Sequence, residues 1–183
     1  MVKRKKEIKG QLWLLVGILA FIIYQYGGKT LAAVSNLIAG ASLKDFVNKY
    51  KAYAINTQNK YAVPYEVTLA QEALESGYGK HAPNFNFFGI KYTGRYGGKQ
   101  SLDTLEYRAG AMVKVKQDFE TFSGPEQAFN AHADTLRRVY PAAFNYTDPY
   151  KFAEKLTSGT LKYATDPNYN EKISKLITQI RSL

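Results

Sequence analysis

The sequence contains no cysteine and only two histidines among its 183 residues. A chain without thiols has no disulfide framework, no thiolate zinc or iron–sulfur site and no cysteine nucleophile. Two histidines are too few for a zinc site with three histidine ligands. Four glycines lie within residues 89–98, but neither common phosphate-loop pattern is present. These absences exclude thiol catalysis, a three-histidine zinc site and the usual phosphate-binding loops.

Apolar and aromatic side chains are abundant instead. Apolar residues make up 45% of the chain, which has 15 tyrosines and 10 phenylalanines. This composition excludes a fully disordered chain and can fill the core of one domain with a short appendage. The formal net charge of +10 is densest at the N-terminus, where five of the first nine residues are Lys or Arg. Elsewhere basic residues are scattered among acidic ones, so nucleic-acid binding is not expected.

An apolar run follows the basic cluster. Residues 8–27 are long enough to span a bilayer if Lys9 extends its amine to the interface. Trp13 lies near one end of this run, and Tyr24 and Tyr26 lie near the other, which suits the two aromatic belts of a membrane span. The basic cluster is expected to stay cytoplasmic, which sends the rest of the chain across the membrane.

We therefore predict a basic transmembrane signal anchor over residues 1–28 and a linker over residues 29–42. A cleaved secretory signal is one alternative, although no small-x-small site directly follows the apolar run. A buried or oligomerising hydrophobic helix is the other alternative.

Helix signals recur through the remaining sequence as N-cap residues, capping boxes or prolines of a first turn. They stand at Ser42, Pro64, Ser123–Glu126, Asp148–Pro149 and Asp166–Pro167. Gly77 is expected to end the second of these helices, and the last should run to about Ser182. Residues 104–107 and 112–119 predict a β-hairpin, and residues 88–92 a short strand. The expected fold class is a small, mainly helical α+β domain with a β-hairpin inserted between helices.

The segment of residues 69–91, LAQEALESGYGKHAPNFNFFGIK, is the most informative for chemistry. Glu75 lies on the last turn of an apolar helix, where the helix dipole and partial burial would both raise a carboxyl pKa, as a general acid requires. A solvated Glu75 is the plainer alternative. Glu72 lies on the same helix face and is expected to be structural or exposed. Glu106, in the hairpin, faces either solvent or a groove.

Aromatic and amide side chains are concentrated in the same region and beyond it. These side chains could stack on sugar rings of a substrate, or they could form a core beneath a long loop. The cluster comprises Tyr78, Asn84, Phe85, Asn86, Phe87, Phe88, Tyr92 and Tyr96. Tyr163 could project its phenol toward a cleft or pack in the core. His132 is expected to be a hydrogen-bonded core residue rather than a base.

Four blocks together resemble a known family, the peptidoglycan endo-β-N-acetylglucosaminidases with a lysozyme-like fold. These enzymes occur in autolysins, flagellar wall hydrolases and phage lysins. The similar blocks are residues 69–91, TLEY at 104–107, FETFSGPEQAFNAHADTL at 119–136 and YATDPNYNEKI at 163–173. They stand in the family's order, and the resemblance covers residues 43–182. It implies a lysozyme-like domain with a β-hairpin lobe, and a glucosaminidase catalytic domain over residues 43–183.

The resemblance also implies roles for individual residues. Glu75 matches the general acid, Glu106 the second acidic residue, and Tyr163 a tyrosine that assists the substrate's N-acetyl group. The N-x-F-G-I-K stretch and its flanking tyrosines are expected to bind substrate through Tyr78, Asn86, Phe88, Gly89, Lys91 and Tyr92. Tyr78 stands where the family commonly has Trp. No metal or cofactor is expected, because an acid, a second carboxylate and a bound sugar suffice.

The expected function is cleavage of the β-1,4 bond after N-acetylglucosamine in peptidoglycan. The catalytic domain would be tethered to the membrane on its periplasmic or extracellular side, or secreted after signal cleavage. Besides glycan strands and the membrane, a secretion, conjugation or phage assembly is an expected partner. A muramidase or lytic transglycosylase of the same fold is one alternative, and a non-catalytic wall-binding component is another.

Overall fold

The computed structural model describes residues 43–108, 111–164 and 166–183. The anchor expected over residues 1–28 and the linker over 29–42 lie outside these ranges. Among the described residues, no helix is both long and apolar enough to cross a membrane.

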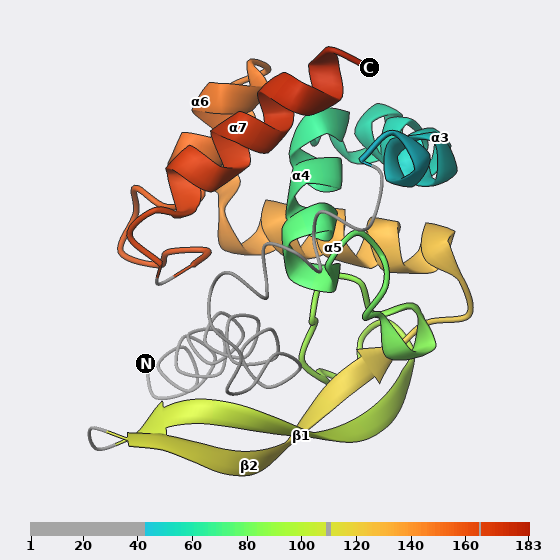
Figure 1. The fold of residues 1–183 in the computed structure, drawn as a ribbon, viewed down its shortest axis with the longest axis vertical. Helices are drawn as coiled ribbons and strands as arrows, with labels where there is room; N and C mark the ends of the chain where they lie inside the picture. Colours follow the sequence, from blue (N-terminus) through green and yellow to red (C-terminus); the bar gives the residue numbers. More distant parts are fainter. Residues whose placement is uncertain (1–42, 109–110, 165) are drawn as a thin grey trace.

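The helices form one lobe of the domain, and a hairpin forms the other (Figure 1). The α-helices are α3 (Leu43–Tyr61), α4 (Tyr65–Ser76), α5 (Pro125–Val139), α6 (Pro149–Lys155) and α7 (Tyr169–Arg181). Two short 3-10 helices are η1 (Pro83–Phe85) and η2 (Pro141–Asn145). The mainly helical α+β class is therefore confirmed for the described part of the chain.

Helix α4 is the central element of the helical lobe. It packs against α3, α7 and α6, and ten of its 12 residues are buried. Pro64 is its N-cap, and Gly77 ends it in the left-handed conformation, with its N–H donating to the Ala73 carbonyl. These limits agree with the predicted ones. Because neighbours surround α4, its polar side chains are buried along with its apolar ones.

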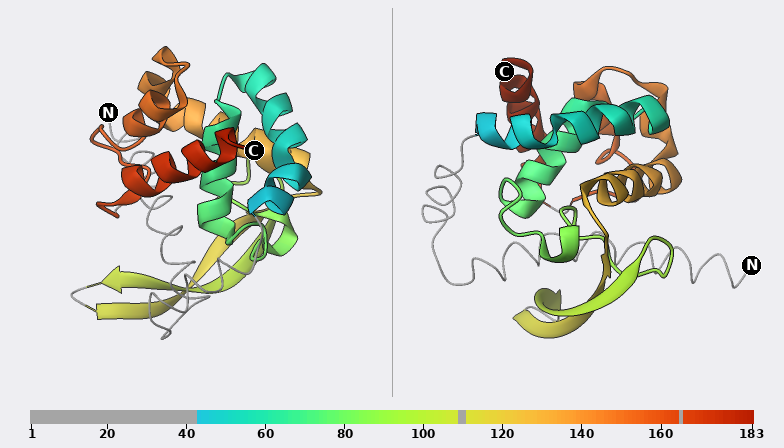
Figure 2. Two further views of the ribbon diagram at one scale, coloured as in Figure 1. Left: turned by 45° about the horizontal axis from the view of Figure 1, so that its top comes forward. Right: turned by 90° about the vertical axis from the view of Figure 1, so that its right-hand side faces the viewer.

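The two-stranded sheet pairs β1 (Gly98–Arg108) with β2 (Ala111–Thr121). The strands are antiparallel, in a register from Gly98 opposite Thr121 to Arg108 opposite Ala111. The hairpin extends away from the helices in both views of Figure 2. It is longer than predicted, whereas the strand expected over residues 88–92 is reduced to a single bridge between Lys91 and Phe119.

Two of the expected helix caps need correction. Gly124, rather than Ser123, is the N-cap of α5, and the Ser123 amide and hydroxyl both donate to Gln127 Oε1 instead. Asn168, rather than Asp166, is the N-cap of α7, and Asp166 accepts a hydrogen bond from the Asn168 amide. The N-cap of α6 is as predicted, since Asp148 accepts from the Lys151 amide at 2.9 Å.

Candidate active site

Glu75 lies on the last turn of α4 and is 5% exposed. Its Oε2 atom is buried and has no hydrogen-bond partner among the described residues. Burial raises the pKa of this carboxyl from its ordinary value of 4.5 to about 8, because the charged form loses its hydration and no cation of the described residues offsets that loss. Glu75 is therefore protonated at neutral pH and can donate a proton.

Tyr163 and Tyr169, from a part of the chain distant from α4, lie close enough to this carboxyl for its charge to act on them, and Tyr140 packs against Tyr163. The Tyr163 ring centroid lies 5.9 Å from that of Tyr140 and 5.5 Å from that of Tyr169. The hydroxyls of Tyr140 and Tyr163 are buried, and neither has a hydrogen-bond partner among the described residues. Burial raises the pKa of Tyr163 and Tyr169 well above its usual value, and the charge of ionised Glu75 adds to the rise. The phenols are therefore neutral and can act as hydrogen-bond donors.

The turn after Glu75 is held by backbone geometry that favours glycine. Gly77, Tyr78 and Gly79 have φ angles of 58°, 62° and 77°, all in the left-handed region. A Cβ on Gly79 would lie 2.9 Å from Cε2 of Tyr50. Tyr78 is half-buried, and its ring meets Phe46 edge-on at 5.6 Å between centroids. The G-Y-G sequence therefore turns the chain sharply out of α4.

Asn86 and Phe88, two of the expected binding residues, are both buried. The Asn86 amide donates to the carbonyls of Ile90 and Glu120 at 2.9 and 3.0 Å, and its oxygen accepts from the Ile90 amide at 2.8 Å. Phe88 is fully buried and stacks on His132, with ring centroids 3.9 Å apart. The Phe88 ring is therefore covered in this structure, and its expected contact with substrate stays a prediction.

The other expected binding residues differ in exposure. Gly89 is buried with a φ of 58°, and Lys91 is 5% exposed with its Nζ donating to Gln117 Oε1 at 3.1 Å. Tyr92 is 41% exposed, and the Lys99 ammonium lies 5.7 Å from its ring centroid. Tyr92 and half-buried Tyr78 are thus the expected binding residues with aromatic surface to offer.

Glu106 lies on β1 opposite Val113, and its side chain is outside the described part of the structure. The roles expected for Glu75, Glu106 and Tyr163 stay predictions. The structure does bring Glu75 and Tyr163 into the same buried cluster, although 88 residues separate them in the chain.

Two buried carboxyls were not identified as important from the sequence. Glu72 is fully buried, neither of its oxygens has a partner, and burial raises its pKa well above the usual value despite an opposing effect of Lys49. Glu120 is fully buried at the end of β2 and accepts from the Thr93 amide and hydroxyl, both at 2.8 Å, and from the Gly97 amide at 3.2 Å. No periodic signal marks Glu120, because its partners lie in an irregular loop.

His132 is a core residue, as expected, but it is not hydrogen-bonded. Neither ring nitrogen has a hydrogen-bond partner in the part of the chain that the structure describes, and burial lowers the pKa of the ring to about 3. The ring is therefore neutral at neutral pH. Within the described residues no group of acidic and histidine side chains could hold a metal ion.

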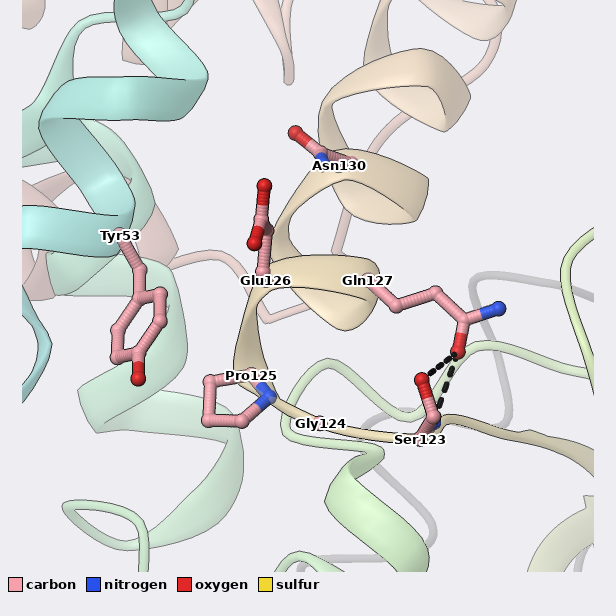
Figure 3. A pocket seen from close by; sticks show the side chains of 7 residues that line it. All are labelled: Tyr53, Ser123, Gly124, Pro125, Glu126, Gln127 and Asn130. Carbon is pink, nitrogen blue, oxygen red and sulfur yellow. Dashed lines mark hydrogen bonds between the residues drawn. The ribbon is translucent and has the colours of Figure 1, made fainter.

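A cavity of about 460 Å³ lies apart from these residues, between α3 and the start of α5 (Figure 3). Tyr53 enters it from α3, and Glu126 and Asn130 from α5. None of its lining residues is among the expected site residues.

Residues 51–182 match the glucosaminidase family, described as mannosyl-glycoprotein endo-beta-N-acetylglucosaminidase. The chain belongs to this family. Its solved relatives include a glycoside hydrolase domain, which confirms the expected class of enzyme and the lysozyme-like fold at the level of the family.

Three proteins show the extent of the similarity. The peptidoglycan hydrolase FlgJ of Salmonella typhimurium is 32% identical over 150 residues, covering 76% of this chain and 47% of the relative. A structure of its truncated glycoside hydrolase domain has a TM-score of 0.65 and covers 78% of this chain and 99% of that one. The catalytic domain of the autolysin Auto from Listeria monocytogenes is 25% identical, with a TM-score of 0.67, and covers 84% of this chain and 96% of that one.

A third relative, from Lactococcus lactis, is named as a probable N-acetylmuramidase. It is 30% identical over 149 residues, covering 75% of this chain and 34% of the relative. The chain spans about half the length, or less, of the curated relatives it matches.

Proposed function

We propose that residues 43–183 form the catalytic domain of a peptidoglycan hydrolase that cleaves the β-1,4 bond after N-acetylglucosamine. The family match supports a glucosaminidase, and the name of the FlgJ relative supports peptidoglycan as the substrate. The observation that carries the proposal is the state of Glu75, a buried carboxyl without a cation whose pKa rises to about 8. A general acid needs to hold its proton at the working pH.

In this proposal Glu75 transfers its proton to the glycosidic oxygen as the bond to the sugar breaks. Glu106 either activates the attacking water or stabilises the positive charge that develops on the sugar. Tyr163 assists the substrate's N-acetyl group. The Tyr163 hydroxyl is buried in this structure. Assistance to the N-acetyl group therefore requires the bound sugar to reach the cluster formed by Tyr140, Tyr163 and Tyr169.

Substrate contacts follow from which side chains are exposed. Tyr92 and Tyr78 offer aromatic surface on which a sugar ring can stack. Asn86, with its three hydrogen bonds, and buried Gly89 shape the loop that carries Tyr92. Lys91 is held beside the hairpin through Gln117.

Membrane attachment through residues 1–28, with the catalytic domain on the wall side, is part of the same proposal. The basic cluster and apolar run of the sequence support it. A retained anchor predicts that the full-mass protein stays with membranes after alkaline carbonate extraction. A shorter, soluble product would support signal cleavage instead. Pull-down of the anchored protein would show whether a secretion, conjugation or phage assembly accompanies it.

The test of the reaction is digestion of purified peptidoglycan by the full chain, followed by borohydride reduction and mass spectrometry. Reduced N-acetylglucosamine ends from the wild type, lost in Glu75→Gln, would support the proposal. Glu171→Gln is the matched control, since it makes the same change at an exposed carboxyl of α7. Cleavage that survives in Glu75→Gln would overturn the role of Glu75.

A muramidase or lytic transglycosylase is the second candidate, and the Lactococcus relative favours it. The same digestion distinguishes the two. Reduced muramic ends would indicate a muramidase, and anhydro-muramic ends a lytic transglycosylase. Retained wall binding without any cleavage would indicate a non-catalytic wall-binding protein.

A further inference from the structure

Gln71 and Tyr169 form a buried polar pair on the side of α4 that carries Glu75. Gln71 precedes Glu75 by four residues, so the two side chains share one face of the helix. Gln71 is fully buried, and its Nε2 donates to the hydroxyl of Tyr169 at 3.0 Å. Tyr169 is the first residue of α7 and is 2% exposed. The pair therefore joins two helices beside the candidate acid.

The direction of this hydrogen bond determines what the phenol can do next. Nε2 is a donor only, so it occupies a lone pair of the Tyr169 oxygen and leaves the phenol's own proton to be donated elsewhere. Buried polar groups are rarely left without a partner. Oε2 of Glu75 is a buried acceptor that lacks a donor among the described residues, so the Tyr169 hydroxyl does not bond it in this structure. One further hydrogen bond would satisfy both the phenol and the carboxyl.

We propose that Tyr169, oriented by Gln71, is a positioning residue whose hydroxyl donates a hydrogen bond to Oε2 of Glu75 as this carboxyl loses its proton. The inference rests on the proposed function, in which Glu75 is the acid. The proton moves from the carboxyl to the glycosidic oxygen, and the negative charge left on the carboxylate is stabilised by the phenol O–H. Hydrogen bonds of this kind are often long in the unliganded enzyme and shorten during the reaction.

Other ionisable groups stand on α4 and on the elements that pack against it. They are Glu72 on α4, Lys49 on α3, and exposed Lys151 and Glu154 with half-buried Lys155 on α6. His132 and Tyr140 reach the cluster through their ring contacts with Tyr163. The pKa of His132 is lowered to about 3 and that of Tyr140 and Tyr163 is raised, so these three are neutral near pH 7. The charge of Lys49 lowers the pKa of Glu72, against the larger rise caused by burial. Of the phenols of Tyr140, Tyr163 and Tyr169, only that of Tyr169 is oriented by a hydrogen bond from a described side chain.

The test measures the titration of Glu75 directly, by the ¹³C resonance of its carboxyl in the full chain. The resonance is assigned as the one lost in Glu75→Gln. In Tyr169→Phe we expect the pKa of Glu75 to rise by about one unit, because the ionised form loses its donor. In Gln71→Met the rise should be smaller, because the phenol remains but is no longer oriented. Under the proposed function, kcat of Tyr169→Phe should fall about tenfold.

A purely structural role predicts the opposite shift. Loosened packing would admit water and lower the pKa of Glu75 toward its ordinary value. Tyr140→Phe is the matched control, because it removes one buried hydroxyl that has no partner, and it should leave the Glu75 titration in place. A fall or no change in Tyr169→Phe, or an equal rise in Tyr140→Phe, would overturn the inference. The titration needs no turnover, so its outcome is separate from failure of the proposed reaction.

Discussion

At the scale of single residues, Glu75 and Asp118 show how differently this domain treats two carboxyls. Asp118 is on the exposed hairpin, where a hydrogen bond from the Ser101 hydroxyl lowers its pKa. Glu75 is buried without such a donor, and its pKa rises to about 8. The first carboxyl is held ionised and the second protonated, so only the second is suited to general-acid catalysis.

The pH dependence of activity should follow from this difference. Because the acid must carry its proton, we expect kcat/KM for glycan cleavage to fall as pH rises through about 8. Glu75→Gln should reduce kcat by about 10²–10⁴-fold at all pH values. The measurement is a pH profile with reduced chain ends as readout. An alkaline limb near pH 5 would contradict a buried, protonated Glu75.

Two aromatic residues of the same loop should respond oppositely to truncation. Tyr92→Ala removes a half-exposed ring and should weaken binding to glycan while changing the free energy of unfolding by less than about 0.5 kcal/mol. Phe88→Ala removes a fully buried ring and should cost about 3–5 kcal/mol of unfolding free energy. Urea denaturation and wall-binding assays measure the two effects. Equal stability losses would refute the assigned placements.

At the scale of elements, side chains at the hairpin base shape the loop after α4. Asn86 closes a tight turn onto Ile90 and reaches the backbone of β2, and Glu120 accepts from both Thr93 and Gly97. The loop therefore depends on the hairpin for its conformation, although its own sequence shows no regular period. We therefore expect the hairpin and the loop that carries Tyr92 to lose their ordered conformation together when either is destabilised.

Glu120→Gln tests this dependence. The new amide would face a backbone N–H that needs an acceptor, so we expect a loss of about 1–3 kcal/mol in unfolding free energy. Faster hydrogen exchange of the Thr93 and Gly97 amides should accompany the loss. Asp103→Asn is the matched control, because Asp103 forms an ion pair with Lys114 at the surface. This substitution should lower the free energy of unfolding by less than about 1 kcal/mol. Unchanged exchange at Thr93 would show that Glu120 does not hold the loop.

At the scale of the whole molecule, buried Glu75 and buried His132 have opposite effects on the way the free energy of unfolding changes with pH. The pKa of Glu75 rises on folding from about 4.5 to about 8, so its contribution to stability is present at low pH and is lost as pH rises through that window. The pKa of His132 falls on folding from 6.5 to about 3, so its contribution is lost as pH falls through that lower window. Glu72 acts in the same direction as Glu75.

Because two glutamates oppose one histidine, the domain should be most stable at acidic pH, at about pH 4.5–5. The unfolding free energy of the full chain, measured in urea at a series of pH values, should decline from there toward pH 8. Glu75→Gln should reduce this alkaline decline, because the substituted amide does not ionise. A decline of equal size in the variant would show that Glu75 is not the group responsible.

Local signals in the sequence were sufficient for much of the helical framework. The limits of α4 follow from Pro64 and Gly77, and the cap of α6 from Asp148, because these residues act on backbone groups within a few positions. Ser123 failed as a cap because its amide and hydroxyl both bond Gln127 Oε1, and Gly124 takes the N-cap place. Even short-range signals can therefore be displaced by neighbouring side chains.

The order of helices and hairpin, and the segment around Glu75, could be predicted from residue order alone, because periodicity and capping are local properties. The environment of Glu75 could not. It depends on Tyr163 and Tyr169, which are distant in the chain and meet α4 only when α7 packs against it. Burial is a property of the packed molecule, and burial is what raises the pKa of Glu75, covers Phe88 and leaves His132 neutral.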